Sequence, residues 1–492
     1  GERALQSNTT GCHNTAIGSY ALRDSLSGCH NFAAGHCALY AGGVGGNNVG
    51  IGDCALRCNT TGCKNVVIGQ RGMITNTTGK QNIALGTHPL NLNTTGDDNI
   101  GLGADALGKN TTGDDNVAIG DQALRCNTEG TGNVAVGPSA LYSNNTGNQN
   151  TAIGGVALYC NSTGYANFGV GYEALRYNTT GSRNIALGTA ALAGCSDGST
   201  ASCNIAFGNE SNRLSLSGCH NFAAGQCALY SNYGGCYNNA IGLDALKCNT
   251  TGAYNTGIGW NALCSNTTGT DNQAIGRYTL RYNTTGVSNN AIGYGALHCN
   301  TTGSYNTAIG SPALYNNTEG SSNAAIGYNA LQYNTTGASN NAIGWIALNC
   351  NTTGSHNTAI GNNTLRSNTT GSHNTAIGCV ALCSSLSGDH NFAAGRCALY
   401  GNWGGCYNTA IGIDALKCNT TGVCNVAIGP YALRYNTTGC HNNALGYNLM
   451  ANTTGCYNAA IGDSALNANT TGGWNTAIGQ YAQIGNTTGC YN

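Results

Sequence analysis

Apolar and polar positions follow one another along this chain in a pattern that returns every 17 residues. An asparagine opens each unit, beginning at Asn14 and holding the same spacing as far as Asn184. After three additional residues the pattern resumes at Asn204, runs to Asn442, loses one residue, and ends at Asn492. The unit reads N-x-A-I-G-x-x-A-L-x-x-N-T-T-G-x-x, and its residues are numbered here as positions 1 to 17.

Glycine recurs at position 5 and almost as regularly at position 15. Such glycines mark corners where the backbone needs a positive φ or a close approach to another segment. Between the corners lie two short apolar segments, x-A-I-G and x-A-L-x, which in the first full unit are residues 15–18 and 20–23. A corner every 7 to 10 residues excludes helices, so both segments are predicted to be strands. The fold class is therefore all-β: one parallel β-solenoid with 17 residues per coil and about 29 coils.

Stacked coils bring equivalent residues into rows along the solenoid. The position-1 asparagines are expected to form a ladder of side-chain amides that hydrogen-bond from coil to coil. A second interpretation, compatible with the first, is that asparagine only tolerates a left-handed turn conformation. Adjacent apolar residues at positions 3 and 4, and again at 8 and 9, are expected to point to opposite faces. One face would line the interior, and the other would be covered by something else, such as a second chain.

The repeat gives no sign of a linker or a domain boundary. Residues 1–492 are predicted to form one continuous domain, with an insertion near 195–203 and a one-residue deletion near 451. At ~4.8 Å per coil, such a solenoid would be roughly 140 Å long. The chain opens on Gly1 in the middle of the pattern, without an initiator methionine or a signal peptide, which indicates a processed or partial mature chain.

Composition narrows the classes of partner. Only 8% of the residues are charged, and 18 Lys and Arg balance 19 Asp and Glu. Because no basic patch is present, nucleic acid is not an expected partner. No apolar run approaches the ~20 residues of a membrane helix, so membrane insertion is not expected either. A chain with so few charges needs another source of solubility.

The corner N-T-T-G supplies an acceptor motif for N-linked glycans, N-x-[ST], in most units. In a secreted protein these asparagines would carry covalent N-glycans on one corner of the solenoid and supply the missing hydration. The acceptors at position 12 are Asn8, Asn59, Asn76, Asn93, Asn110, Asn144, Asn161, Asn178, Asn249, Asn266, Asn283, Asn300, Asn334, Asn351, Asn368, Asn419, Asn436, Asn452, Asn469 and Asn486; three others, outside that register, are Asn209, Asn316 and Asn362. The competing interpretation is that Asn-Thr-Thr-Gly is simply good turn chemistry, copied by duplication.

The chain has 26 cysteines but no C-x-x-C motif and no Cys/His spacing of the zinc-finger kind, so no metal site and no cofactor are predicted. An even number of cysteines without metal signatures favours disulfides in an oxidising compartment. The predicted pairs are Cys12 with Cys29, Cys37 with Cys54, Cys219 with Cys236, and Cys440 with Cys456 between adjacent coils, Cys195 with Cys203 beside the insertion, and Cys379 with Cys383 within one loop.

In three near-identical segments, 25–40, 215–230 and 385–400, Ser-Leu-Ser-Gly replaces Asn-Thr-Thr-Gly, and a Gly-rich turn follows, which in the last is Asn-Trp-Gly-Gly at 402–405. Each therefore lacks the glycan acceptor over two successive coils. These windows are hypothesised to contact neighbouring subunits, although duplication of a ten-coil block explains them equally well. The residues singled out for such contacts are Phe32, Phe222, Phe392 and Trp403.

The "NTAIG…AL…NTTG" units resemble the head repeats of YadA-type trimeric autotransporter adhesins and the related repeats of tail-fibre-like surface proteins. The likeness covers essentially the whole chain. It implies a left-handed parallel β-roll, often a parallel trimer, in a fibrous surface protein. This sequence departs from that pattern in its longer unit, its many cysteines, and the lack of a coiled-coil stalk or membrane anchor, which puts trimerisation and adhesion in doubt.

No catalytic arrangement of residues stands out, and the chain is predicted not to be an enzyme. Asp97 and Asp98 would stack on Asp114 and Asp115, one coil away, where four carboxylates can hold a cation, although a solvated loop fits better. Histidines fall mostly at position 17 and are interpreted as solvent-facing loop residues.

The predicted function is that of a structural subunit of a secreted, N-glycosylated filament or fibre at a cell or virion surface. Its main partner would be itself, stacked head to tail through unpaired solenoid edges, with lateral or trimeric association as a further possibility. The alternative is an adhesin or tail-fibre shaft that binds cell-surface glycans. An ice-binding solenoid is a weaker third hypothesis.

Overall fold

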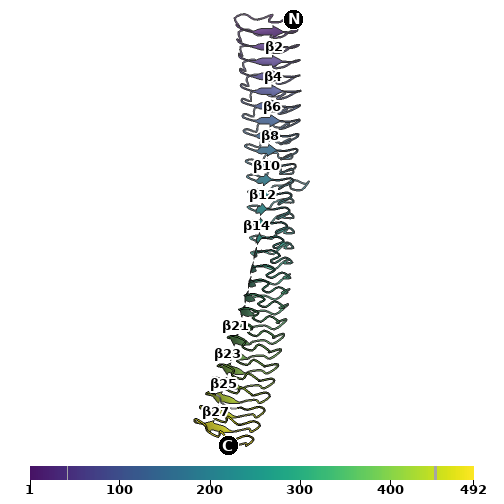
Figure 1. The fold of residues 1–492 in the computed structure, drawn as a ribbon. Helices are drawn as coiled ribbons and strands as arrows, with labels where there is room; N and C mark the ends of the chain where they lie inside the picture. Colours follow the sequence, from purple (N-terminus) through teal and green to yellow (C-terminus); the bar gives the residue numbers. More distant parts are fainter. Residues whose placement is uncertain (42, 448–450) are drawn as a thin grey trace. The chain divides into compact units, whose positions relative to one another are not determined.

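The computed structural model describes residues 1–41, 43–447 and 451–492. It confirms the predicted fold class, a parallel β-solenoid with 17 residues per turn and no helix among these residues. The chain divides into two compact units, Gly1–Thr251 (unit 1) and Gly252–Asn492 (unit 2). Within each unit the strands stack in the order of the sequence, from purple to teal in unit 1 and from green to yellow in unit 2 (Figure 1).

Unit 1 carries one three-residue strand per turn. These strands are β1 (Thr15–Ile17), β2 (Phe32–Ala34), β3 (Val49–Ile51), β4 (Val66–Ile68), β5 (Ile83–Leu85), β6 (Ile100–Leu102), β7 (Val117–Ile119), β8 (Val134–Val136), β9 (Thr151–Ile153), β10 (Phe168–Val170), β11 (Ile185–Leu187), β12 (Ile205–Phe207), β13 (Phe222–Ala224) and β14 (Asn239–Ile241).

Unit 2 repeats the same arrangement. Its strands are β15 (Thr256–Ile258), β16 (Gln273–Ile275), β17 (Asn290–Ile292), β18 (Thr307–Ile309), β19 (Ala324–Ile326), β20 (Asn341–Ile343), β21 (Thr358–Ile360), β22 (Thr375–Ile377), β23 (Phe392–Ala394), β24 (Thr409–Ile411), β25 (Val426–Ile428), β26 (Asn443–Leu445), β27 (Ala459–Ile461) and β28 (Thr476–Ile478).

The pairing register follows the sequence repeat. Ala16 of β1 lies opposite Ala33 of β2, a separation of 17 residues. The insertion near 195–203 changes only the loop, since β11 and β12 stay in register through Ala186 and Ala206. The deletion is absorbed in the same way between β26 and β27. Each strand therefore keeps its place in the row even where the loop length changes.

The prediction of a second strand in each unit, x-A-L-x at residues 20–23 and its equivalents, is wrong. This segment is a turn in which two residues adopt the left-handed conformation, with φ of 61° at Tyr20 and 49° at Leu22. The left-handed region costs a non-glycine residue about 1–2 kcal/mol. Full burial of the leucine contributes about 1.5–3 kcal/mol and offsets that cost. Inter-turn hydrogen bonds, such as Leu22 N–H to Ala38 O at 3.0 Å, hold the turn in place.

Because one apolar pair lies in a strand and the other in a turn, positions 3 and 4 point differently from positions 8 and 9. In the strand, position 3 is buried and position 4 is on the outside, as the alternation predicts: Ala325 is fully buried, and Ile326 is 39% exposed. In the turn, positions 8 and 9 both point inward, so Ala330 and Leu331 are both fully buried. The prediction of opposite faces therefore holds for positions 3 and 4 and fails for positions 8 and 9.

Candidate functional site

The position-1 asparagines form the predicted ladder. Asn48 donates from its backbone N–H to Asn31 Oδ1 at 2.9 Å and from Nδ2 to the same oxygen at 3.1 Å. Its Nδ2 also donates to Gly62 O, across its own turn, at 2.9 Å. The side chain thus links neighbouring turns and closes its own turn at once. The ladder interpretation is confirmed.

A second asparagine ladder runs along position 12, which the sequence analysis assigned to glycans. Asn300 is fully buried, and its Nδ2 donates to Asn283 Oδ1 at 2.7 Å and to Gly303 O at 2.9 Å. Its own Oδ1 accepts from Asn317 Nδ2 at 2.8 Å. Both hydrogens of the amide are therefore engaged inside the solenoid. The signal was present in the sequence, because most units have an Asn three residues before a Gly, and this spacing lets the Asn amide close the turn.

This burial conflicts with the predicted glycans at position 12. An N-glycan replaces a hydrogen on Nδ2, and in this fold Nδ2 has no path to solvent. Except for Asn8 and Asn486, which are half-buried, every position-12 acceptor is buried. Among the acceptors outside the register, Asn209 and Asn362 are exposed and Asn316 is half-buried. The competing interpretation, turn chemistry copied by duplication, fits the position-12 corners better.

Peptide mass spectrometry of the natively isolated protein distinguishes glycan acceptors from turn residues at position 12. Peptides containing Asn93, Asn300 and Asn351 are expected to carry unmodified asparagine, because their amides are inside the ladder. Glycans, where present, are expected at Asn209 and Asn362. Hexosamine on the three buried residues in folded material would contradict the ladder.

The three Ser-Leu-Ser-Gly windows interrupt the position-12 ladder. Ser25, Ser215 and Ser385 occupy position 12 there, and each is buried with a hydroxyl that has no hydrogen-bond partner. The hydroxyl is too short to reach the next rung. Asn368 Oδ1, the acceptor facing Ser385, is likewise left without a partner. The windows therefore lack inter-turn hydrogen bonds of the position-12 ladder, in addition to lacking the acceptor motif.

The aromatic residues proposed for subunit contacts lie at the surface to different degrees. Phe392 is 37% exposed and Trp403 is 59% exposed, both in unit 2. Phe32 and Phe222 in unit 1 are half-buried, and Phe222 packs edge-on against Phe207 with ring centroids 6.0 Å apart. Trp403 and Phe392 are therefore the more accessible of the four, and a role in subunit contact remains a prediction.

The cysteines of the predicted disulfide pairs are free thiols in the structure, and the pairs differ in geometry. The sulfur atoms lie 2.7 Å apart in the pair Cys12–Cys29 and also in Cys219–Cys236. Their stacking one turn apart is as predicted; the covalent bond stays a prediction.

The other predicted pairs are described by their backbone hydrogen bonds and their burial. Cys440 donates its backbone N–H to Cys456 Sγ at 3.1 Å, and Cys54 donates its own to His36 O, next to Cys37, at 2.9 Å. Cys379 is exposed, whereas Cys383 is buried. Cys195 lines a cleft beside the insertion, and Cys203 bonds through its backbone to Ser182 O.

Position 17 carries exposed rings that stack on one another. His356, His373 and His390 continue into Tyr407, with centroid separations of 4.8, 4.7 and 4.8 Å and nearly parallel planes. The residues adopt a left-handed backbone, for example φ of 59° at His356, which directs each ring along the row. The histidines are solvent-facing, as predicted, but they are ordered into a column whose ring faces are occupied by their neighbours.

In the acidic cluster around Asp97 and Asp114, carboxylates accept hydrogen bonds from backbone N–H groups of the neighbouring turn. Asp97 Oδ1 accepts from Lys80 N–H at 2.7 Å, and Asp114 Oδ1 accepts from Asp97 N–H at 2.8 Å. Asp98 accepts from the Gln81 amide at 2.8 Å. Serines at position 16 make the same inter-turn bond elsewhere, as Ser321 does to Ser304 N–H at 3.1 Å. The carboxylates thus repeat a structural role.

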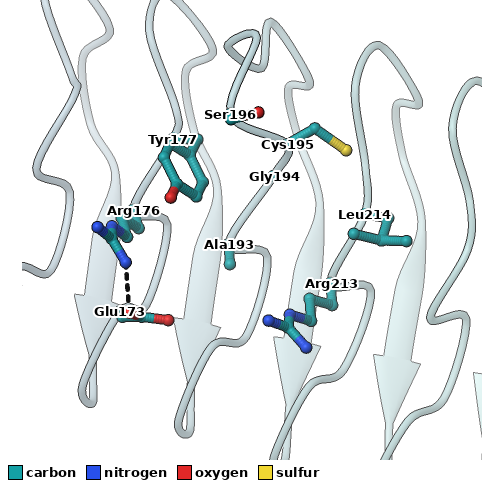
Figure 2. Close-up of a pocket in the computed structure, with 9 residues that line it drawn as sticks. All are labelled: Glu173, Arg176, Tyr177, Ala193, Gly194, Cys195, Ser196, Arg213 and Leu214. Atoms are coloured by element: carbon teal, nitrogen blue, oxygen red, sulfur yellow. Dashed lines mark hydrogen bonds and ion pairs between the residues drawn. The ribbon is translucent and has the colours of Figure 1, made fainter.

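A cleft of about 440 Å³ lies where the insertion leaves the solenoid, after strands β10, β11 and β12 (Figure 2). Position 10 is arginine in the two outer turns, Arg176 and Arg213, and the short Ala193 between them leaves the space open. The inserted loop, with Cys195 and Ser196, forms the wall opposite the arginines.

The charges in this cleft are already paired. Arg176 bonds to Glu173 and lies 4.9 Å from the centre of the Tyr177 ring. Arg213 donates to Glu210 at 2.7 Å and to the Tyr230 hydroxyl at 3.1 Å. Burial raises the pKa of the Cys195 thiol, which keeps it in its weakly nucleophilic protonated form. The arrangement offers neither an excess of positive charge nor an activated nucleophile.

A helix able to cross a membrane is missing from the described residues. No protein-family model matches the chain, and no curated protein matches it significantly. The resemblance to adhesin head repeats is therefore borne out only at the level of a parallel β-solenoid of regular 17-residue turns.

Proposed function

We propose that this chain is a structural subunit of an extracellular fibre or filament. The observation that carries the proposal is the pair of buried asparagine ladders, at positions 1 and 12, in both units. Each turn is bonded to the next by the same side-chain and backbone groups, so cohesion is spread over the whole repeat. A repeat in which nearly every fixed residue joins neighbouring turns is suited to mechanical continuity.

An exposed apolar row supports association between copies. In unit 2 the position-4 isoleucines Ile275, Ile292, Ile309, Ile326, Ile343, Ile360 and Ile377 are each between 37% and 41% exposed. They lie on successive strands in register, at a spacing of about 4.8 Å. A continuous apolar row of this kind marks an interaction surface. Its proposed occupant is the same row of a second copy.

Head-to-tail stacking of copies would use the backbone hydrogen bonds that join turns within one chain. Every turn presents the same backbone donors and acceptors to the next, so an edge turn of one copy can pair with an edge turn of another. The trimeric association seen in the resembling adhesin heads is one way to bury the isoleucine row. We propose glycans only for the exposed Asn209 and Asn362, which leaves the row uncovered.

Electron microscopy and light scattering test the proposal together. The purified chain is expected to form elongated assemblies whose mass rises with concentration. Replacing Ile309, Ile326 and Ile343 by serine is expected to lower the assembly mass, because the row loses its apolar centre. The matched control is Tyr328→Ser, which removes a 52% exposed ring outside the row and should leave assembly unchanged. A wild-type chain that stays monomeric at all concentrations would refute the proposal.

A further inference from the structure

The tetrapeptide Gly-Cys-His-Asn occurs in two successive turns, at 11–14 and 28–31. Because the spacing equals one turn, stacking brings two thiols and two imidazoles together at one exposed corner of unit 1. The Cys12 and Cys29 sulfurs are 2.7 Å apart. The His13 and His30 rings stack with centroids 4.8 Å apart. The ligand atoms of Cys12, His13 and His30 all lie within 4.8 Å of one another.

We propose that Cys12, His13, Cys29 and His30 form a binding site for a divalent transition-metal ion, zinc above all. Two thiolates and two imidazoles are a ligand set that zinc takes in tetrahedral geometry. The inference is independent of the proposed fibre function. The sequence alone does not indicate the site, because metal-site motifs have spacings of a few residues, whereas these ligands are brought together by the 17-residue repeat.

The geometry needs only small side-chain movements to close on an ion. Tetrahedral bonds of 2.0–2.3 Å place ligand atoms roughly 3.3–3.8 Å apart. The Cys12 and Cys29 sulfurs therefore separate by about 1 Å. The ligand atoms of Cys12, His13 and His30, which lie within 4.8 Å of one another, draw together by up to about 1.5 Å, and Cys29 joins them through its contact with Cys12 Sγ. Cys12, His13 and His30 are exposed, so these rotations displace no packed core. The two thiols lose their protons when the metal binds.

The pair Cys219–Cys236 provides an internal comparison in the same unit. Its sulfurs are also 2.7 Å apart. Burial raises the pKa of Cys219 to about 11, which disfavours the thiolate. The second ring of this turn pair is Tyr237, stacked on His220 at 4.9 Å, so a tyrosine replaces the second imidazole.

Alkylation mapped by mass spectrometry tests the site despite the many cysteines. The full chain is reduced, freed of metal, given one equivalent of Zn²⁺ and exposed to iodoacetamide. Alkylation of Cys12 and Cys29 is expected to slow by about tenfold or more, since zinc-bound thiolates are shielded. Cys219 and Cys236 should react at unchanged rates. The variant His13→Asn with His30→Asn, in which asparagine suits the left-handed backbone, is expected to lose the protection.

Three results would overturn the site. The first is equal protection in the double histidine variant, and the second is equal protection of Cys219 and Cys236, because either would mean that stacked thiols alone bind the ion. The third is a Cys12–Cys29 disulfide-linked peptide in protein isolated without reductant, because the disulfide predicted from the sequence and the proposed metal site need the same two sulfurs.

Discussion

Replacing Gly310 by alanine is expected to break the solenoid at that turn, with a loss of unfolding free energy above about 4 kcal/mol. Gly310 has φ of +135°, a region that side-chain-bearing residues rarely adopt. A Cβ there would lie 2.4 Å from Gly327 O and 2.7 Å from Gly327 C. Both atoms are backbone of the next turn, so no side-chain rotation relieves the overlap. The turns must separate locally, which breaks their hydrogen bonds.

Hydrogen exchange of peptides spanning 292–327 measures this effect, since the backbone amides there bond to neighbouring turns. Gly485→Ala is the matched control, because a Cβ at Gly485 meets nothing within 4 Å. Its exchange pattern should equal that of the wild type. Wild-type protection in the Gly310 variant would mean that position 5 does not approach the next turn as described.

Asn300→Asp is expected to destabilise unit 2 by about 3–5 kcal/mol at neutral pH. The side chain keeps its shape, but the carboxylate cannot donate, so its oxygen faces Asn283 Oδ1 and Gly303 O, two acceptors. Burial favours the neutral acid, so the pKa of the new carboxyl rises in the folded state. The loss should therefore grow as pH rises above about 4, the unfolded value, and shrink below it. Urea unfolding followed by circular dichroism, at neutral pH and at a pH below about 4, measures this loss of unfolding free energy.

The same substitution on the surface isolates the role of burial. Asn362→Asp changes an exposed side chain and is expected to stay within about 0.5 kcal/mol of the wild type. Restoring a missing asparagine to the ladder should have the opposite effect. Ser385→Asn should stabilise unit 2 by about 1 kcal/mol, because the new amide supplies a partner for Asn368 Oδ1. Equal effects of the two aspartates would count against the position-12 ladder.

The period and the register were predictable from the sequence because they depend on residues that recur at fixed spacing. Glycine at position 5 allows the backbone to turn a corner with positive φ. Asparagine at position 1 has a side-chain amide long enough to hydrogen-bond to the neighbouring turn. The strand pairs β11 with β12 and β26 with β27 keep this register across the expected insertion and deletion.

The features that could not be predicted from the sequence arise only once turns are stacked. No local preference predicts a left-handed leucine such as Leu22, because its cost is offset by burial against neighbouring turns. The acceptor motif around Asn300 looks like a modification site in isolation, and only stacking shows that Nδ2 is enclosed. The cluster of Cys12, His13, Cys29 and His30 is likewise formed by residues one turn apart.

The central claim is that two rows of asparagine amides are locked inside the solenoid. Exchange of side-chain Nδ2 protons, followed by NMR on protein labelled selectively at asparagine, tests it most directly. Position-1 and position-12 residues such as Asn306 and Asn300 are predicted to retain their amide protons far longer than the exposed Asn362. Exchange of Asn300 as fast as that of Asn362 would contradict the ladder and the fold built on it.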